Sequence, residues 1–146
     1  MSYSDREKIM EFFADDGKRR VGFCVLGGMF SEGIDLPGDR LIGVVVVGVG
    51  LPGLSNERNI MRDYYEEKCA QGYDYAYTYP GMNSVLQAVG RVIRRDTDRG
   101  VAVLIDDRFA EPKYRELFPD EWKHIKYARN SSTLAEITSN FWKKQD

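Results

Sequence analysis

The spacing of apolar residues divides the chain into alternating helical and extended segments. Three segments carry apolar residues at helical intervals: residues 4–13, 55–71 and 80–96. Three short apolar runs, rich in valine, predict buried strands: Val21–Leu26, Leu41–Val47 and Val101–Ile105. Strands that alternate with helices of ten or more residues are typical of an α/β domain with a parallel sheet. The near-continuous valine run further predicts a sheet that is covered on both faces.

Several residues mark where the predicted helices begin and end. Ser4 and Glu7 form an S-x-x-E capping box at the start of the first helix. Gly72 is suited to end the second helix as a left-handed residue. Thr133 and Glu136 form a T-x-x-E box that predicts the start of the last helix. The signals agree with the apolar periodicity and indicate ordered elements along the whole chain.

Length and composition predict one globular domain. The chain has 146 residues, of which 42% are hydrophobic and 30% are charged, which is sufficient for a real core. We expect residues 1–146 to form a single domain, with residues 123–146 as a helical extension. Because the pattern opens on a helix, we expect the sheet to lack an upstream strand and the chain to be a piece of a larger protein. We expect the chain itself to be monomeric.

Charge and cysteine usage exclude several classes of protein. The longest apolar run, Leu41–Val49, is far shorter than the roughly 20 residues of a membrane helix, so we predict a cytoplasmic protein without a membrane partner. Cys24, Cys69 and the single histidine, His124, offer no metal-ligand spacing, so we predict no metal site. A net charge of −2 means that any nucleic acid must be bound by a local patch.

A glycine-rich stretch, residues 27–38, follows the first predicted strand. Glycine-rich turns at the carboxyl end of a parallel strand can direct backbone N–H groups at a phosphate. The alternative is a tight loop with a capping serine. No G-x-x-x-x-G-K-[ST] loop occurs anywhere in the chain, so a nucleotide site cannot be complete here.

A second stretch, Gln87–Arg95, places polar residues on one face of a predicted helix. Gln87, Arg91 and Arg94 are separated by four and three residues, opposite an apolar stripe of valines. Gly90 costs about 1 kcal/mol relative to alanine inside a helix, so it predicts a close approach to the backbone at this point. Guanidinium groups match phosphate oxygens. The alternative is a solvated basic face.

Two further motifs suggest other functions. Gly48–Gly53 fits the G-x-G-x-x-G pattern of dinucleotide-binding domains, but Pro52 lacks an N–H and no acidic residue ends a second strand about 20 residues later. Asp106 and Asp107 end the last strand, where a turn-capping role is favoured over magnesium binding.

Taken in order, these segments resemble the end of the XPD and DinG type of superfamily 2 DNA helicases, from about Arg6 to Trp122. S-E-G-I-D-L at residues 31–36 resembles motif V, and Gln87 to Arg94 resembles motif VI, Q-x-x-G-R-x-x-R. The resemblance implies a RecA-like parallel sheet flanked by helices, as the second of two motor domains that clamp ATP between them.

The resemblance also implies residue roles. Arg91 and Arg94 would act as arginine fingers on the γ-phosphate, positioned by Gln87. The remaining assignments fall into two groups: Gly33, Asp35 and Gly90 at the nucleotide, and Gly27, Gly28 and Ser31 at single-stranded DNA.

The same resemblance implies ATP and Mg²⁺ as cofactors of the full-length protein, neither of them bound stably by this chain alone. It implies a first RecA-like domain and single-stranded DNA as partners, and a location at the nucleoid or in the nucleus where DNA is bound. The parent would be an ATP-dependent DNA helicase, and this chain alone would be inactive.

A tyrosine-rich region offers a different hypothesis, a non-catalytic module that docks proteins. Its residues are Tyr64, Tyr65, Tyr73, Tyr75, Tyr77 and Tyr79. Tyrosine is enriched at interfaces, but aromatic residues also build cores, so both roles are open.

Overall fold

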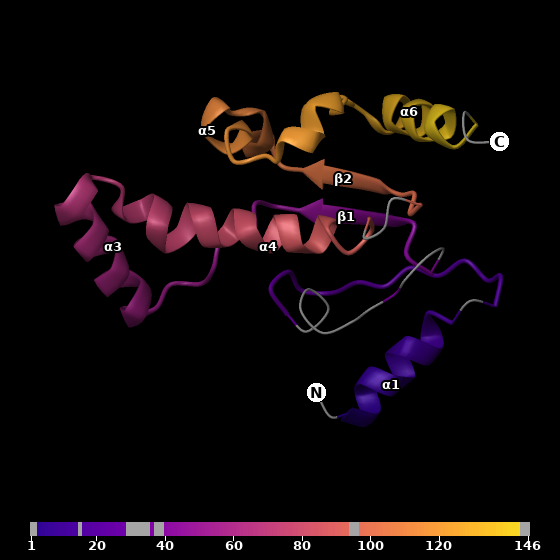
Figure 1. Ribbon diagram of the computed structural model, residues 1–146, viewed down its shortest axis with the longest axis horizontal. Helices are drawn as coiled ribbons and strands as arrows, with labels where there is room; N and C mark the ends of the chain where they lie inside the picture. The colour runs from indigo at the N-terminus through magenta and orange to yellow at the C-terminus, as the bar shows by residue number, and fades with distance from the viewer. Residues whose placement is uncertain (1–2, 15, 29–35, 37–39, 94–96, 144–146) are drawn as a thin grey trace. The chain divides into compact units, whose positions relative to one another are not determined.

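The computed structural model describes residues 3–14, 16–28, 36, 40–93 and 97–143, without the side chains of residues 3–6. The chain divides into two compact units, residues 1–111 and 112–146 (Figure 1). The first contains α1 (Tyr3–Phe12), β1 (Gly43–Val47), α3 (Asn56–Cys69), η2 (Asp74–Thr78), α4 (Tyr79–Val89), β2 (Val101–Ile105) and η3 (Asp107–Ala110). The second contains α5 (Pro112–Arg115), η4 (Asp120–His124) and α6 (Ser131–Lys143).

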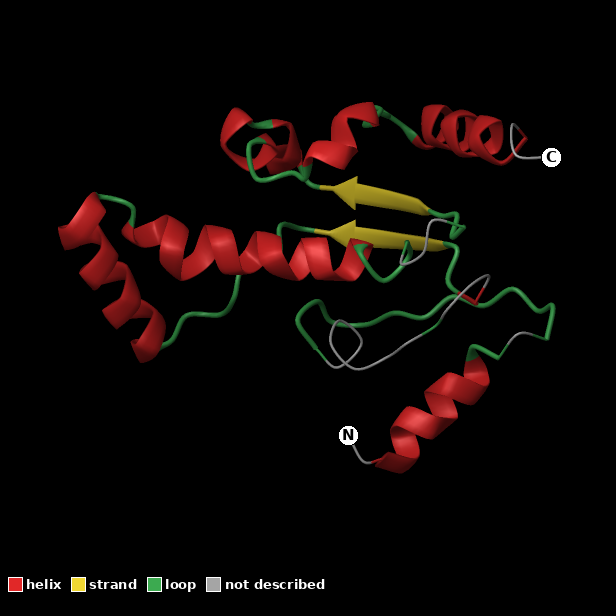
Figure 2. Ribbon diagram, viewed as in Figure 1, coloured by secondary structure: helices red, strands yellow, loops and turns green. Residues whose placement is uncertain are grey.

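The first unit contains a two-stranded parallel sheet, whose strands run side by side in the same direction (Figure 2). Gly43 of β1 pairs with Val101 of β2, and the register runs to Val47 and Ile105. Parallel strands need a long crossover connection, which α3, η2 and α4 supply here. The predicted α/β class and parallel pairing are therefore confirmed.

Helix α4 covers one face of the sheet. Its Val85 and Val89 are buried, and so is Val46 of β1, which is 4% exposed. Val45 and Val47 alternate with Val46 and point to the other face, where they are 60% and 74% exposed. The expectation of a sheet covered on both faces is therefore wrong for the part of the chain that is described.

The first predicted strand, Val21–Leu26, is not a strand. Residues 21–25 have no regular secondary structure, and Val21, Phe23 and Val25 are strongly exposed. A strand persists only where a neighbour satisfies its backbone N–H and C=O groups. β1 pairs with β2, and no described strand pairs with this segment. Apolar content alone therefore did not decide its structure.

A close backbone contact joins the end of β1 to α4. A methyl group added at Gly81 of α4 would lie 2.7 Å from the carbonyl oxygen of Val49, and one added at Gly50 would lie 2.8 Å from that of Gly81. Val49 is almost completely buried at this contact. Gly50 also adopts a φ of +66°, a region that favours glycine. The contact fixes where α4 begins relative to the sheet.

The helix boundaries differ from the expected signals at three places. α1 begins at Tyr3, so Ser4 lies inside it. α3 ends on Ala70, whose φ of 54° makes it the left-handed residue in place of Gly72. α6 begins after Asn130, whose side-chain Oδ1 accepts a hydrogen bond from the backbone amide of Thr133 at 2.9 Å, so the cap is three residues before the expected one.

Gly72 is needed in the turn after α3 because of its close contacts, and not because it is a left-handed residue. A methyl group there would overlap the carbonyl oxygen of Arg62 in α3. The amide of Gly72 donates to the Glu66 carboxylate at 2.9 Å, which ties the turn to α3. The chain then enters the π-helical turn η2 and runs directly into α4. The tyrosine-rich segment between the two predicted helices is therefore largely helical.

No described helix combines the length and the apolar character that a membrane crossing requires.

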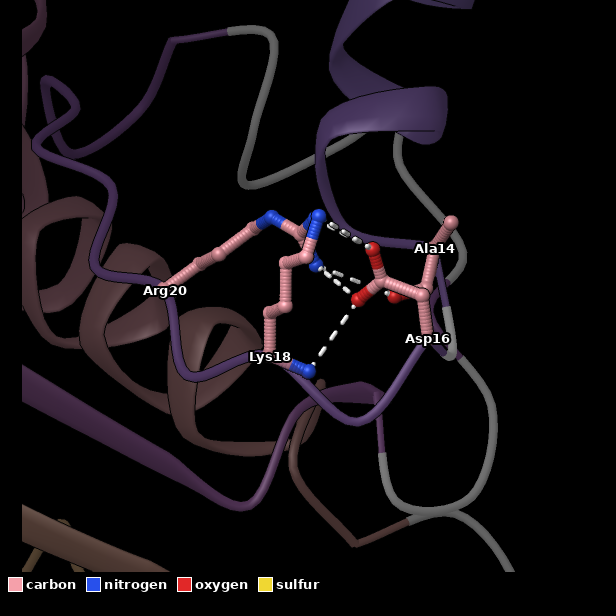
Figure 3. Close-up of polar contacts among 4 residues, drawn as sticks. All are labelled: Ala14, Asp16, Lys18 and Arg20. Carbon is pink, nitrogen blue, oxygen red and sulfur yellow. Dashed lines mark hydrogen bonds and ion pairs between the residues drawn. The ribbon is translucent and has the colours of Figure 1, made fainter.

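An ion pair closes the turn that follows α1 (Figure 3). The Arg20 guanidinium donates to both carboxylate oxygens of Asp16, at 2.5 and 2.6 Å, and to the carbonyl oxygen of Ala14 at 3.3 Å. The same guanidinium lies 5.6 Å from the ring centre of Phe12. Hydrogen bonds from Arg20 lower the pKa of the Asp16 carboxyl from its ordinary 3.8 to about 2.

This contact predicts an acid-sensitive turn. A carboxyl whose pKa is lowered by folding stabilises the folded state above pH 3.8, and that contribution is lost as the pH falls through about 2. We expect the carboxyl carbon of Asp16, followed by NMR, to titrate near pH 2. Arg20→Gln should move the midpoint toward 3.8, whereas Lys18→Gln should not, because the Lys18 ammonium lies 3.8 Å away and is mostly exposed. Equal midpoints in all three proteins would contradict this.

The Gly81 contact predicts a steric cost. Gly81→Ala should lower the free energy of unfolding by about 1–3 kcal/mol, because the new methyl group meets backbone atoms that cannot rotate away. Gly53→Ala is the matched control, since nothing lies within 4 Å of the methyl group there. Urea unfolding of both variants measures the difference, and equal stabilities would show that the backbone approach is not tight.

Candidate functional site

Helix α4 positions most of the candidate residues that are described. Pro80 stands in its first turn, where the missing N–H costs nothing, and Met82 and Val85 continue the apolar stripe. Val85, Val89 and Val92 are all buried, as the sequence predicts. Gln87 is exposed on a different face from this stripe. The helix therefore holds Gln87 toward solvent by burying the valines.

The helix ends earlier than expected, and this changes the setting of the arginines. α4 stops at Val89, and Gly90 is its C-cap with φ −62° and ψ −8°. The amides of Arg91 and Val92 then bond three residues back, to Ala88 and Val89, at 3.2 and 3.0 Å. The expectation that Gln87, Arg91 and Arg94 share one helix is thus wrong for Arg91. Arg94 lies outside the described residues.

Gly90 has a local explanation. A methyl group there would lie 3.2 Å from the carbonyl oxygen of Leu86 and 3.7 Å from that of Gln87, both in the same helix. No other described atom lies within 4 Å of that position. No distant segment of the described chain approaches Gly90, and the residue serves to end the helix.

The side chain of Val92 holds the turn that carries Arg91. A methyl group at Gly100 would overlap the Cγ1 atom of Val92, so Val92 packs directly onto the Gly100 backbone. Gly100 immediately precedes β2, and its neighbour Val101 donates to the carbonyl oxygen of Ile42 at 3.0 Å. Arg91, which is half-buried, is thereby fixed near the amino ends of both strands. Sequence analysis did not single out Gly100.

The glycine turn of the first motif lies beside α4. Gly27 has a φ of +78°, and a methyl group there would lie 3.9 Å from the hydroxyl oxygen of Ser84. Ser84 is three residues before Gln87, so these two positions lie on one side of α4, and Arg91 follows in the turn after the helix. The amide of Gly28 donates to the carbonyl oxygen of Val25 at 3.1 Å. Helical spacing from Gln87 would have identified Ser84.

Three further candidate residues of this motif, Ser31, Gly33 and Asp35, lie outside the described residues. Leu36, between two such stretches, is buried. Leu26 contacts the Gly50 position, so the turn and the end of β1 meet at Gly50.

The carboxylates after β2 have a structural role. Asp106 caps η3, and its carboxylate accepts the amide and the guanidinium of Arg108 at 2.8–3.0 Å. These hydrogen bonds lower the pKa of Asp106. The capping role expected for this pair is confirmed for Asp106. The described histidine, cysteine and acidic residues form no group of three that could hold a metal ion.

The G-x-G-x-x-G segment is used for packing. Gly50 faces Gly81 and Leu26, as described above. Gly48 has a φ of +87°, and its amide donates to the carbonyl oxygen of Ile105 at 3.0 Å, which extends the sheet. The following helix begins only after the cap at Ser55. Its first two glycines are thus accounted for without a dinucleotide.

The tyrosines stack on one another between α3 and η2. The rings of Tyr65 and Tyr75 are parallel with centres 3.9 Å apart, and Tyr75 meets Tyr79 edge-on at 5.1 Å. Tyr77 is buried, whereas Tyr64 is 54% exposed. The region therefore combines a structural stack with exposed aromatic surface, and the docking hypothesis stays a prediction.

Comparison with known proteins decides the family. The model of the helicase C-terminal domain matches residues 2–125. This chain belongs to that family. It is the C-terminal part of a superfamily 2 helicase domain of the XPD and DinG type. The resemblance expected from motifs V and VI is confirmed at the level of the family.

Named relatives of this helicase domain agree. It is 32% identical over 132 residues to the regulator of telomere elongation helicase 1 homolog of Caenorhabditis briggsae, covering 84% of the chain and 13% of the relative. It is 30% identical over 111 residues to the general transcription and DNA repair factor IIH helicase subunit XPD of Dictyostelium discoideum, covering 74% and 14%. It is 31% identical over 103 residues to the ATP-dependent DNA helicase chl-1 of Caenorhabditis elegans, covering 70% and 12%.

The contact between Val92 and Gly100 can be tested by a double-mutant cycle in this helicase domain. Gly100→Ala should cost about 1–3 kcal/mol of unfolding free energy, because the methyl group overlaps Val92. In a Val92→Ala background the same change should cost less, since the overlapping Cγ1 atom is gone and only the contact with the Ile42 carbonyl oxygen at 3.1 Å remains. Thermal or urea unfolding of the four proteins gives the coupling. Strictly additive losses would contradict direct packing.

Proposed function

We propose that this chain is the second motor domain of an ATP-dependent DNA helicase. The family supports this, and relatives are named as DNA helicases. The chain spans 12–14% of the length of the relatives described above, so the activity belongs to a much larger protein. In it, a first RecA-like domain would hold the triphosphate, and this domain would close on it. Such a protein works on DNA in the nucleus or at the nucleoid.

The observation that carries the proposal is the position of the glycine turn on α4. Gly27 lies beside Ser84, which shares one side of α4 with Gln87, and Arg91 follows in the turn after the helix. At 1.5 Å per residue, Ser84 and the last residue of α4, Val89, are about 8 Å apart along the axis. A DNA-contacting turn beside α4 and a phosphate-contacting arginine just past its end would be connected through this helix.

Arg91 would act as an arginine finger. A guanidinium is planar, permanently charged and matched to phosphate oxygens. Val92 is buried against Gly100, which holds the arginine in place before any nucleotide arrives. Preorganised charge is effective because it needs no rearrangement during the reaction. Gln87 is exposed one turn earlier and would orient the phosphate or Arg91.

The remaining roles rest on the resemblance. Arg94 would be the second finger, Gly33 and Asp35 would line the nucleotide, and Gly90 would let it approach the helix end. Gly27, Gly28 and Ser31 would contact the backbone of single-stranded DNA. Gly27 and Gly28 support this role by local geometry, because both are accessible or half-accessible in a tight turn.

ATP and Mg²⁺ are the implied cofactors, and the described residues suit only part of that site. Arg91 can neutralise phosphate charge. Asp106 is already engaged by its own helix cap and by Arg108, so it does not offer a free carboxylate to Mg²⁺. The metal ligands and phosphate loop are then the contribution of the other domain, and this chain alone should bind nucleotide weakly and hydrolyse none. When bound, ATP would supply the phosphoryl group, and Mg²⁺ would neutralise the charge on its phosphates.

The finger assignment predicts a large loss of turnover in the full-length protein. Arg91→Ala and Arg94→Ala should each reduce DNA-stimulated ATPase by about 10³–10⁵, because an arginine finger contributes that much to phosphoryl transfer. Arg62→Ala is the control, since Arg62 lies exposed on α3 and pairs with its neighbour Asp63 at 2.8 Å. Steady-state phosphate release measures all three. Near wild-type turnover in both finger variants would remove the assignment.

A further inference from the structure

The second unit carries a surface that the proposed motor site does not use. It holds seven Lys and Arg against five Asp and Glu, a net charge of +2, whereas residues 1–111 have a net charge of −4. Within it, residues 122–135 contain three cationic side chains and no acidic one. The cations are therefore concentrated in one segment of an otherwise acidic chain.

Arg115, Lys126, Tyr127 and Arg129 define what we call the basic–aromatic patch. The Arg115 guanidinium lies 5.8 Å from the ring centre of Tyr127, so it holds the ring by a cation–π contact. Tyr127 nevertheless stays 57% exposed. A ring that is fixed in orientation and open to solvent can accept a second planar group by stacking.

The charges around the ring are available for binding. Lys126 and Arg129 are exposed, and neither forms an ion pair within the described part of the chain. By contrast, the nearby Lys123 is paired with Asp120 at 3.1 Å. Lys126 and Arg129 are three residues apart in a segment without helix or strand geometry. Three residues span at most about 10 Å, which limits the distance between the Cα atoms of the two residues. Two free cations therefore flank one exposed ring.

We propose that the basic–aromatic patch binds single-stranded DNA without sequence preference. Such sites combine cations that follow the phosphate backbone with aromatic rings on which bases stack. Lys126 and Arg129 contact phosphates, and Tyr127 stacks on a base with Arg115 on its other side. The choice of DNA over another polyanion rests on the proposed helicase function. The residues themselves are separate from Gly27, Gly28 and Ser31.

The test measures binding of the 146-residue chain to a fluorescein-labelled 20-nucleotide oligo(dT) by anisotropy, at several salt concentrations. Lys126→Gln/Arg129→Gln should weaken binding at low salt and lower the slope of log K against log salt by about 1.4, or about 0.7 for each lost phosphate contact. Lys8→Gln/Lys68→Gln removes the same charge elsewhere and should leave the slope unchanged. Equal losses in both pairs would overturn the proposal.

The aromatic component is tested separately. Tyr127→Ala should weaken oligo(dT) binding about tenfold, and Tyr127→Phe should retain it, because stacking needs the ring and not the hydroxyl. Circular dichroism checks that each variant is folded. Unchanged binding by Tyr127→Ala would exclude stacking. If polyglutamate displaced the labelled oligo(dT) with the same potency as unlabelled oligo(dT), the patch would be a site for acidic proteins instead. Oligo(rU) binding tighter than oligo(dT) would reassign it to RNA.

The outcome is distinguishable from that of the motor proposal. Failure of the arginine fingers would appear as retained ATPase in Arg91→Ala and Arg94→Ala and would leave oligonucleotide binding by the patch intact. Failure of the patch would appear in the anisotropy of the Lys126, Tyr127 and Arg129 variants while the finger variants still lost turnover.

Discussion

The arrangement of the first unit depends on the contact between two glycines, Gly50 and Gly81. With no side chain on either, the end of β1 lies against the first turns of α4 at backbone distance. Val49 is buried there, and Leu26 closes over Gly50 from the preceding segment. Close packing tolerates little added volume, so one contact fixes three segments that are far apart in sequence. The neighbouring glycine turn at Gly27 reaches Ser84 as a consequence.

The far end of α4 is fixed by a second contact of the same kind. Val92 packs onto Gly100, and the chain leaves the helix at Gly90 to make that contact. Arg91 stands between a helix cap and a buried valine, so packing rather than helix propensity determines its position. Arginine on a flexible loop would lose conformational freedom on binding phosphate, whereas a held arginine loses less. The geometry is thus suited to a group that must be in place when two domains close.

Some charged side chains in this molecule stabilise the fold, and others are exposed to solvent and can bind a ligand. Asp16 with Arg20 and Asp106 with Arg108 close turns, and the hydrogen bonds lower the pKa of both carboxyls. These pairs are local, each within four residues, and they stabilise the ends of elements. The basic–aromatic patch of the second unit has a different character, because Lys126 and Arg129 form no ion pair with the described residues and Arg115 lies over the face of the Tyr127 ring. Nucleic acid binding then would not be limited to the glycine turn.

The sequence determined the family, the α/β class, the parallel character of the sheet and the buried valines of α4, because each depends on local periodicity or on motif order. It also identified Asp106 as a cap. Tertiary structure alone decided the rest: whether Val21–Leu26 forms a strand, where α4 ends, and why Gly50, Gly81 and Gly100 must lack side chains. These outcomes depend on which backbone segment packs against each residue. The local sequence does not show which distant segment that will be. The position of Gly27 beside Ser84 was also decided by the tertiary structure, although spacing from Gln87 already places Ser84 on that side of α4.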